Sequence, residues 1–464
     1  MPHGTVHTAI DTLTTQRIRL GVTGFSGSGK TIFICSLVQA LLTASSWASR
    51  PGQGPLQHFR PLHTGKLHAA RLVSGASSTM PEFPFRQVRD SLLGTQAQWP
   101  TPTEGIARLR LSLELNNPAG IAGRLRHTLG WQRQIVLEIV DFPGEWLVDL
   151  PMLAQDYSSW SAKMLTLASR PSRRQHARDY LQYLDGIDAS LGDPHLDGRL
   201  AELWTSYLQA AFASGLPLNQ PGRHLRPDTL RHSPLLHFSP LPDRLAHTPL
   251  YRQMRDRFKQ YQSKVIKPFY KETFAKMDRQ VVLVDLLYAL ATGQEAFDEM
   301  TEALGDTLSS FRYGKGGLLS WLSGYSTTHV LFAATKADHV VRADRANLEA
   351  MLSDLLHYVD DANVLRANAA KVEVMALASV MATEDVRTLK PPHREVLLGR
   401  PKGQDDVLTL DPGGIPLSIP PDWDALAFEY QRFEPPVKHR ALQEGFPAYN
   451  LGRALDFLIG EDMR

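Results

Sequence analysis

The stretch Gly24–Thr31 reads GFSGSGKT and follows the alternating apolar segment Arg17–Thr23 directly, while the apolar run IFICSLVQALL begins at Ile32. This order predicts a strand, a glycine-rich loop and a helix. In a phosphate-binding loop, glycines let consecutive backbone N–H groups turn inward, a lysine adds positive charge and a threonine hydroxyl can ligate Mg²⁺. A loop that only caps a helix is the alternative, but both flanks match the phosphate-loop context. We therefore expect a nucleoside triphosphate site at Ser26, Gly27, Ser28, Gly29, Lys30, Thr31 and Ile32.

Composition narrows the class of protein. The chain has 464 residues, of which 43% are hydrophobic and 21% are charged, and its formal net charge is only +2. These values are typical of a globular protein of two to four units and do not indicate nucleic-acid binding. The first residues lack the pattern of a secretory signal, and no apolar run is long enough to span a membrane, so we expect a cytoplasmic protein whose membrane association, if any, is peripheral. The single cysteine, Cys35, is expected to be a buried apolar residue.

Six segments have the pattern of strands, and most are the nearly continuous apolar runs expected of central parallel strands. They are Arg17–Thr23, Ala107–Leu115, Gln134–Val140, Gln280–Val284, His329–Ala334 and Val372–Leu377. The fold class predicted is α/β, a doubly wound P-loop NTPase sheet of the G-protein-like type. Residues 46–102 are rich in Gly, Pro, Ser and His and are expected to form irregular loops.

Three further motifs follow predicted strands in the order found in GTP-binding proteins. Asp141–Gly144 (DFPG) has the DxxG form, in which the aspartate holds Mg²⁺ and the glycine N–H contacts the γ-phosphate. Thr335–Asp338 (TKAD) resembles [N/T]KxD, with Asp338 accepting hydrogen bonds from guanine and Lys336 lying over the base and bracing the phosphate loop. Ala378–Ser379 resembles the motif whose backbone N–H reads guanine O6. Open α/β sheets bind ligands at the carboxyl ends of their strands, so the motifs together favour GTP.

One residue supports a different reading. Asp285 ends the apolar run QVVLVD and could act as a Walker-B aspartate of an ATPase or kinase, although the following LLYAL offers no glycine for a γ-phosphate. We interpret Asp285 as the end of the fourth strand.

The residues for hydrolysis are less well specified. Thr103, or else Thr101, is the candidate switch threonine that ligates Mg²⁺ together with Thr31 and Asp141. Glu145 stands where many GTPases have glutamine, and a carboxylate beside a triphosphate repels it unless protonated or turned away. We therefore expect slow hydrolysis, with the water positioned by another group or by a protein partner. Candidate charge-stabilising arginines are Arg86, Arg89 and Arg108.

Several strings resemble the YcjX family of bacterial stress-associated P-loop proteins. They are GFSGSGKT, the WPxxT segment Trp99–Thr103, IVDFPGEWLVDLPML from Ile139, LFAATKADHV, RQVVLVDLL, LLGRP and RALDFLIG. The resemblance implies GTP and GDP binding, a helical insertion, cytoplasmic residence and a role in stress.

The expected organisation has four parts: residues 1–150 and 278–390 form the GTPase domain, 151–277 a helical insertion, and 391–464 a small β-containing extension whose terminal helix carries Leu451, Leu455 and Leu458 on one face. Arg170, Arg173, Arg174 and Arg178 are expected to form a solvated helix face or, alternatively, to contact an acidic partner. The functional hypotheses are a slow GTPase switch that uses Mg²⁺, a nucleotide-stabilised scaffold without turnover, and an ATPase or kinase that uses Asp285. The partner and the signal are not specified by the sequence.

Overall fold

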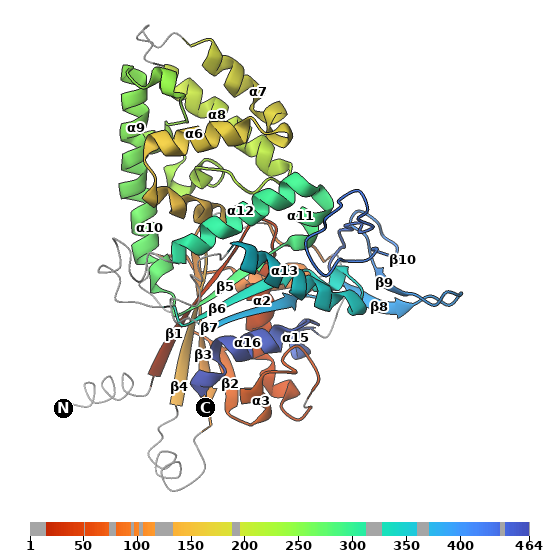
Figure 1. Cartoon of the computed structure of the whole chain (residues 1–464). Coiled ribbons are helices and arrows are strands. Elements are labelled where there is room, and N and C mark those ends of the chain that lie inside the picture. Colours follow the sequence, from red (N-terminus) through yellow and green to blue (C-terminus); the bar gives the residue numbers. More distant parts are fainter. Residues whose placement is uncertain are drawn as a thin grey trace, which may run out of the picture.

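The computed structural model describes residues 15–50, 52–73, 80–93, 97–101, 105–116, 133–187, 195–311, 327–359, 371–436 and 441–463. Its centre is a seven-stranded sheet in the order β2-β3-β4-β1-β5-β6-β7 (Figure 1). The strands are β1 Thr15–Gly24, β2 Leu67–Leu72, β3 Ala107–Leu115, β4 Arg133–Asp141, β5 Arg279–Val284, β6 His329–Thr335 and β7 Lys371–Leu377.

The sheet is mostly parallel. Strands β4, β1, β5, β6 and β7 run parallel to their neighbours, and only β2 and β3 pair antiparallel at one edge. Every residue of β5 and β6 is buried, as expected for strands covered on both faces. All six predicted strands are present within one or two residues, and the α/β P-loop fold class is confirmed.

Residues 46–102 are not wholly irregular, which corrects our expectation. Within this range lie η1 Ala44–Trp47 in part, α3 Arg60–His63, the edge strand β2 and α4 Phe85–Leu93. Strand β2 reads LHAARL, which has little β-branched or aromatic character, and its pairing with β3 supplies what the local sequence lacks.

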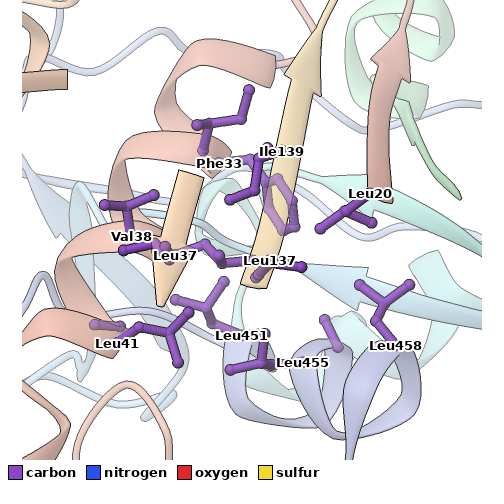
Figure 2. Packing of buried hydrophobic residues seen from close by; sticks show 14 of the residues in the cluster. Leu20, Phe33, Leu37, Val38, Leu41, Leu137, Ile139, Leu451, Leu455 and Leu458 are labelled. Atoms are coloured by element: carbon purple, nitrogen blue, oxygen red, sulfur yellow. The ribbon is translucent and has the colours of Figure 1, made fainter. Parts of the chain in front are cut away.

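Helices cover both faces of the sheet. Helices α2 Lys30–Leu42, α4 and α16 Leu451–Ile459 share one hydrophobic core with the sheet, and Figure 2 shows Leu451, Leu455 and Leu458 of α16 in the same cluster as Leu37 and Leu41 of α2. The core of the other face includes α11 Leu286–Thr292, α12 Gln294–Phe311 and α13 Arg345–Val359. Cys35 is fully buried in the first of these cores, as predicted.

Between β4 and β5 the chain forms a helical body, drawn in yellow and green above the sheet in Figure 1. Its longer elements are η2 Gly144–Ala154, α6 Tyr157–Ala168, α7 Pro171–Asp185, α8 Leu196–Ala213, α9 Pro249–Tyr261, the π-helical turn η7 Gln262–Ile266 and α10 Lys267–Glu272. The short 3-10 turns are η3 Gly222–His224, η4 Asp228–Leu230, η5 Pro234–Leu236, η6 Asp243–Leu245 and η8 Phe274–Lys276. This body, here called the insertion, has its own core, rich in aromatic rings such as Trp160 and Trp204.

The arginine cluster of α7 is not a uniformly solvated face. Arg173 is fully buried and donates to Glu299 of α12 through two guanidinium nitrogens, each at 2.7 Å. Arg170 pairs with Glu302 at 3.1 Å, whereas Arg174 and Arg178 are exposed. The prediction of a solvated face was therefore wrong for Arg173. Its partner carboxylate lies more than a hundred residues away in the sequence, so the pairing could not be seen from neighbouring residues.

The C-terminal part adds a second, three-stranded antiparallel sheet in the order β10-β9-β8. Its strands are β8 Thr383–Arg387, β9 Glu395–Gly399 and β10 Leu408–Leu410. The helices near the C-terminus also include α15 Ala441–Glu444 and η13 Glu461–Met463, and two short turns, η11 Ala337–His339 and η12 Arg342–Asp344, lie between β6 and α13. Helix α16 returns to the main sheet and contacts β6 and β7. The boundaries of the four parts given above stay predictions. None of the described helices combines the length and the apolar character needed to cross a bilayer.

Candidate functional site

The GFSGSGKT loop joins the carboxyl end of β1 to the first turn of α2. Gly29, the residue before α2, has φ 89°, a left-handed conformation that glycine adopts without steric cost. Lys30 begins the helix, and its Nζ donates back to the Gly24 carbonyl at 2.8 Å and to the Phe25 carbonyl at 3.4 Å. The loop therefore places a helix N-terminus and an ammonium group at one mouth, a combination that suits a phosphate group.

The DFPG segment lies against this loop. Asp141, at the end of β4, is in parallel register with Val22 of β1 and is only 1% exposed. A Cβ at Gly144 would lie 1.9 Å from the Gly24 carbonyl oxygen and 3.2 Å from Lys30 Nζ, so only glycine fits there. Asp141 and Thr31 offer hard oxygen donors of the kind that Mg²⁺ takes. Thr31 lies on the wall of the cavity described below, whereas Asp141 is buried at the end of the strand beside β1 and is not on that wall. Thr103 lies outside the described residues.

The TKAD segment follows β6 directly. Lys336 has φ 61°, and its ammonium group donates to the Asp285 carboxylate at 2.5 Å and to the Tyr430 hydroxyl at 2.6 Å. The expected brace from Lys336 to the phosphate loop is thus replaced by contacts to the end of β5 and to the C-terminal part. Burial by itself lowers the pKa of Lys336, but the facing Asp285 and Tyr430 outweigh burial and raise its pKa above the ordinary value.

Asp338 is buried at the base of the same loop. Its Oδ2 accepts the Ala382 N–H at 2.7 Å, and the Thr383 hydroxyl donates to its backbone carbonyl. These bonds fix the direction of the carboxylate.

The Ala378–Ser379 pair is split between two roles. The Ala378 N–H donates to the Tyr449 carbonyl at 3.2 Å and its carbonyl accepts the Tyr449 N–H at 2.8 Å, so this bridge occupies the N–H expected to read a base. Ser379, not Ala378, lies on the wall of the cavity described below. Ser379 is therefore the residue of this motif that lines the cavity.

Asp285 serves as a counter-ion rather than in the arrangement expected of a Walker-B residue. Besides pairing with Lys336, it accepts the Tyr288 N–H at 3.2 Å and so caps helix α11. Strand β5 ends at Val284, so Asp285 is not the last residue of the strand, as we had interpreted it, but the cap residue that follows it.

The insertion contacts the residues that follow DFPG. Arg226 Nε lies 3.5 Å from the Glu145 carboxylate, which is therefore turned toward the insertion. The Arg223 guanidinium carbon lies 3.1 Å from the Trp146 ring centroid, and Trp146 Nε1 donates to the Arg226 carbonyl at 3.2 Å. The segment after DFPG is consequently held by the loop that contains η3.

One cavity of about 570 Å³ is lined by residues of the phosphate-type loop, of the turn after DFPG and of the TKAD loop, but by neither Asp141 nor Ala378. From the predicted site, its walls include Ser26, Gly27, Ser28, Gly29, Lys30, Thr31, Ile32, Gly144, Glu145, Thr335, Lys336, Asp338 and Ser379. Asp285 is on the wall as well. The structure thus brings most of the predicted residues together at the carboxyl edge of the sheet.

Several wall residues carry no sequence motif. They are Tyr288, Lys402, Tyr430, Arg432 and Phe433, four of which come from the C-terminal part. Aromatic and basic residues are common on surfaces, so only the fold identifies them. Among the candidate arginines, Arg89 pairs with Asp90 at 2.7 Å and Arg108 with Glu138 at 3.1 Å, while Arg86 is exposed; these three are not on the cavity wall. Thr101 is exposed.

A phosphate-type loop after the first strand of a mostly parallel sheet, with DxxG on the neighbouring strand, defines a P-loop NTPase of the G-protein-like type. The chain belongs to the YcjX-like family (DUF463), whose model matches residues 18–463. It is similar to a protein of Escherichia coli strain K12 named Ras-like GTPase YcjX, with 35% identity over 468 residues that cover 97% of this chain and 96% of the relative. A Shewanella oneidensis MR-1 protein of the same name is 32% identical over 472 residues, covering 97% of this chain and 95% of the relative.

Proposed function

We propose that this chain binds GTP and GDP with Mg²⁺, hydrolyses GTP slowly and acts as a nucleotide-dependent switch. The observation that carries the proposal is the cavity on whose wall the phosphate-type loop and the TKAD loop meet. The relatives' name, Ras-like GTPase, supports the same activity. A role in stress and residence in the cytoplasm remain predictions from the family resemblance.

Guanine recognition would rest on donor and acceptor geometry. The ring N–H and the exocyclic amine of guanine form a donor pair that adenine lacks, and a carboxylate accepts from both. Asp338 Oδ2 already accepts from Ala382, so its other oxygen would take the main share of this contact. The Ser379 N–H would read guanine O6.

Phosphate binding and hydrolysis would use the opposite end of the cavity. The loop N–H groups and Lys30 would neutralise the phosphates, and Thr31, Asp141 and Thr103 would hold Mg²⁺, which supplies further charge neutralisation when bound. Glu145 is paired with Arg226 instead of facing the phosphates as a neutral water-orienting group. Slow intrinsic turnover is therefore expected; turnover as fast as that of an efficient metabolic enzyme would contradict it.

The test is a change of base preference. Asn in place of Asp338 presents an amide donor where the carboxylate accepted, and xanthine has a carbonyl where guanine has its amine. The wild type should bind GDP at least about tenfold more tightly than ADP or XDP, and Asp338→Asn should favour XDP over GDP. Isothermal titration calorimetry with Mg²⁺ measures these affinities.

The alternatives predict other results. ADP binding that Asp338→Asn leaves unchanged would reject guanine recognition and return attention to Asp285 as part of an ATPase or kinase. Guanine-selective binding without any phosphate release would instead support a nucleotide-stabilised scaffold.

A further inference from the structure

A short C-terminal segment forms the outer wall at the TKAD end of the cavity. We call residues 429–434 the strap. Its backbone is fixed by three hydrogen bonds of 2.8 Å: the Glu429 N–H donates to the Pro412 carbonyl, the Lys402 N–H to the Arg432 carbonyl, and the Glu434 N–H to the Arg400 carbonyl. The strap is therefore held in place by the neighbouring C-terminal loops rather than by the main sheet.

Tyr430 carries the strap's contact with the TKAD loop. Its hydroxyl accepts from Lys336 Nζ at 2.6 Å, and its ring stacks on His339 with 5.8 Å between centroids. The ring also meets Tyr288 edge to face at 5.7 Å, and the Arg432 guanidinium lies 5.5 Å from the Tyr288 centroid. Tyr430 is thus wedged between the TKAD loop and helix α11.

The contact between Tyr430 and Lys336 matters because Lys336 has an unfavourable backbone conformation. A lysine with φ 61° is in the left-handed region, which is unfavourable for a residue with a Cβ. The two bonds from its ammonium group to Asp285 and Tyr430 hold the residue in that conformation. Asp338 follows two residues later. The Ala382 N–H holds its carboxylate on one side, and the conformation of Lys336 sets the path of the backbone that leads to it.

We propose that Tyr430 is a positioning residue for guanine selectivity: by holding the Lys336 ammonium group, the strap fixes the loop that presents Asp338 to the base. The inference rests on the proposed function of this cavity. It makes the C-terminal part, which carries no nucleotide motif, a component of the base site.

The experiment compares Tyr430→Phe, which removes only the hydroxyl, with the control Tyr358→Phe. Tyr358 is 73% exposed and has no part in the proposal. The affinities for GDP and ADP are measured by calorimetry with Mg²⁺, and thermal unfolding is followed without nucleotide. Tyr430→Phe should weaken GDP binding about five- to tenfold, because the effect on the base is indirect and no larger than that of one ordinary hydrogen bond, with little effect on ADP. Tyr358→Phe should change neither affinity.

A double-mutant cycle with Asp338→Ala adds a second readout. If Tyr430 acts through the TKAD loop, Tyr430→Phe should have almost no further effect on GDP affinity once the Asp338 carboxylate is absent. A purely structural role of the hydroxyl would give the same loss in both backgrounds.

The outcomes separate the two proposals. A wild type that binds ADP as tightly as GDP overturns the proposed function and, with it, this inference. A guanine-selective wild type overturns the inference alone if Tyr430→Phe leaves the GDP-to-ADP ratio unchanged, whether both affinities fall equally or neither falls. The inference is supported if Tyr430→Phe lowers the GDP-to-ADP affinity ratio in the wild-type background but has no such effect in the Asp338→Ala background.

Discussion

At the residue after DxxG, one ion pair changes the electrostatic effect that the side chain is expected to have on a nucleotide. Glu145 stands where a carboxylate would repel a triphosphate, yet its side chain is only 8% exposed and faces Arg226 of the insertion. Arg226 thus compensates the negative charge near the proposed γ-phosphate position. A partner eighty residues away in the sequence could not be assigned to Glu145 from the sequence.

Removing that partner should make the site less tolerant of the γ-phosphate. In Arg226→Ala the Glu145 carboxylate loses its counter-ion, and we expect affinity for a non-hydrolysable GTP analogue to fall by about 1 kcal/mol more than affinity for GDP, roughly fivefold. Calorimetric titrations give both values. The control is Arg178→Ala, because Arg178 is 76% exposed and pairs only loosely with Asp179. Equal losses of affinity for the two nucleotides would contradict the compensation. Adding Glu145→Gln to Arg226→Ala removes the uncompensated charge and should abolish the extra loss of affinity for the GTP analogue.

Among the elements of the insertion, the segment that leads into η3 packs directly on η2, the backbone that follows DxxG. A Cβ at Gly222 would lie 1.6 Å from the Glu145 carbonyl oxygen and 2.6 Å from its carbonyl carbon. Gln220 Nε2 donates to the Val148 carbonyl, and the Gly222 N–H donates to the Asp149 carboxylate at 2.7 Å. Element η2 is therefore packed as part of the insertion while it begins at the nucleotide cavity.

Two glycines allow a matched test of this docking. Gly222→Ala should destabilise the protein by about 1–3 kcal/mol, because rigid backbone must move to admit the methyl group. Gly198→Ala, in helix α8 with nothing within 4 Å of its Cβ position, should instead stabilise by about 0.5–1 kcal/mol through helix propensity. Thermal unfolding of the two variants measures both effects. Equal stability of the two would show that the close approach of Gly222 to Glu145 is not maintained in solution.

At the scale of the whole molecule, one buried carboxyl links the folding of the insertion to pH. Asp149 accepts from the Tyr261 hydroxyl at 2.5 Å and from the Gly222 N–H. Burial nevertheless raises its pKa from 3.8 to about 7, against the smaller opposite effect of these two hydrogen bonds. The folded protein therefore binds a proton at pH values where the unfolded chain has already released it.

The sign of the pH dependence follows from this difference. Stability contributed by protonated Asp149 is fully present below the unfolded pKa and is lost as pH rises toward 7, by about 1.4 kcal/mol per pH unit. We expect the melting temperature of the wild type to fall between pH 5 and pH 7 relative to that of Asp149→Asn, which cannot ionise. If the melting temperatures of the two proteins change with pH in the same way across this range, the raised pKa of Asp149 is refuted.

The local motifs were predictable because each is a property of consecutive residues. GFSGSGKT specifies its loop through glycine conformations and a lysine, and the apolar runs specify central strands through continuous burial. Strand β2 escaped prediction because its stability comes from pairing with β3 rather than from its own sequence. The same holds for the bridge that occupies the Ala378 N–H, which depends on Tyr449.

The class of fold, the positions of the six main strands along the chain and the residues of the phosphate-type loop could be inferred from the sequence alone, since backbone conformation and hydrophobic periodicity act over short distances. The folded arrangement was needed to see that Lys336 contacts Asp285 and Tyr430, that Glu145 faces Arg226, and that Arg173 is buried against Glu299. Each of these is a charged side chain whose position depends on partners brought near by folding. Their energies depend on burial and on the facing charge, neither of which can be read from neighbouring residues in the chain.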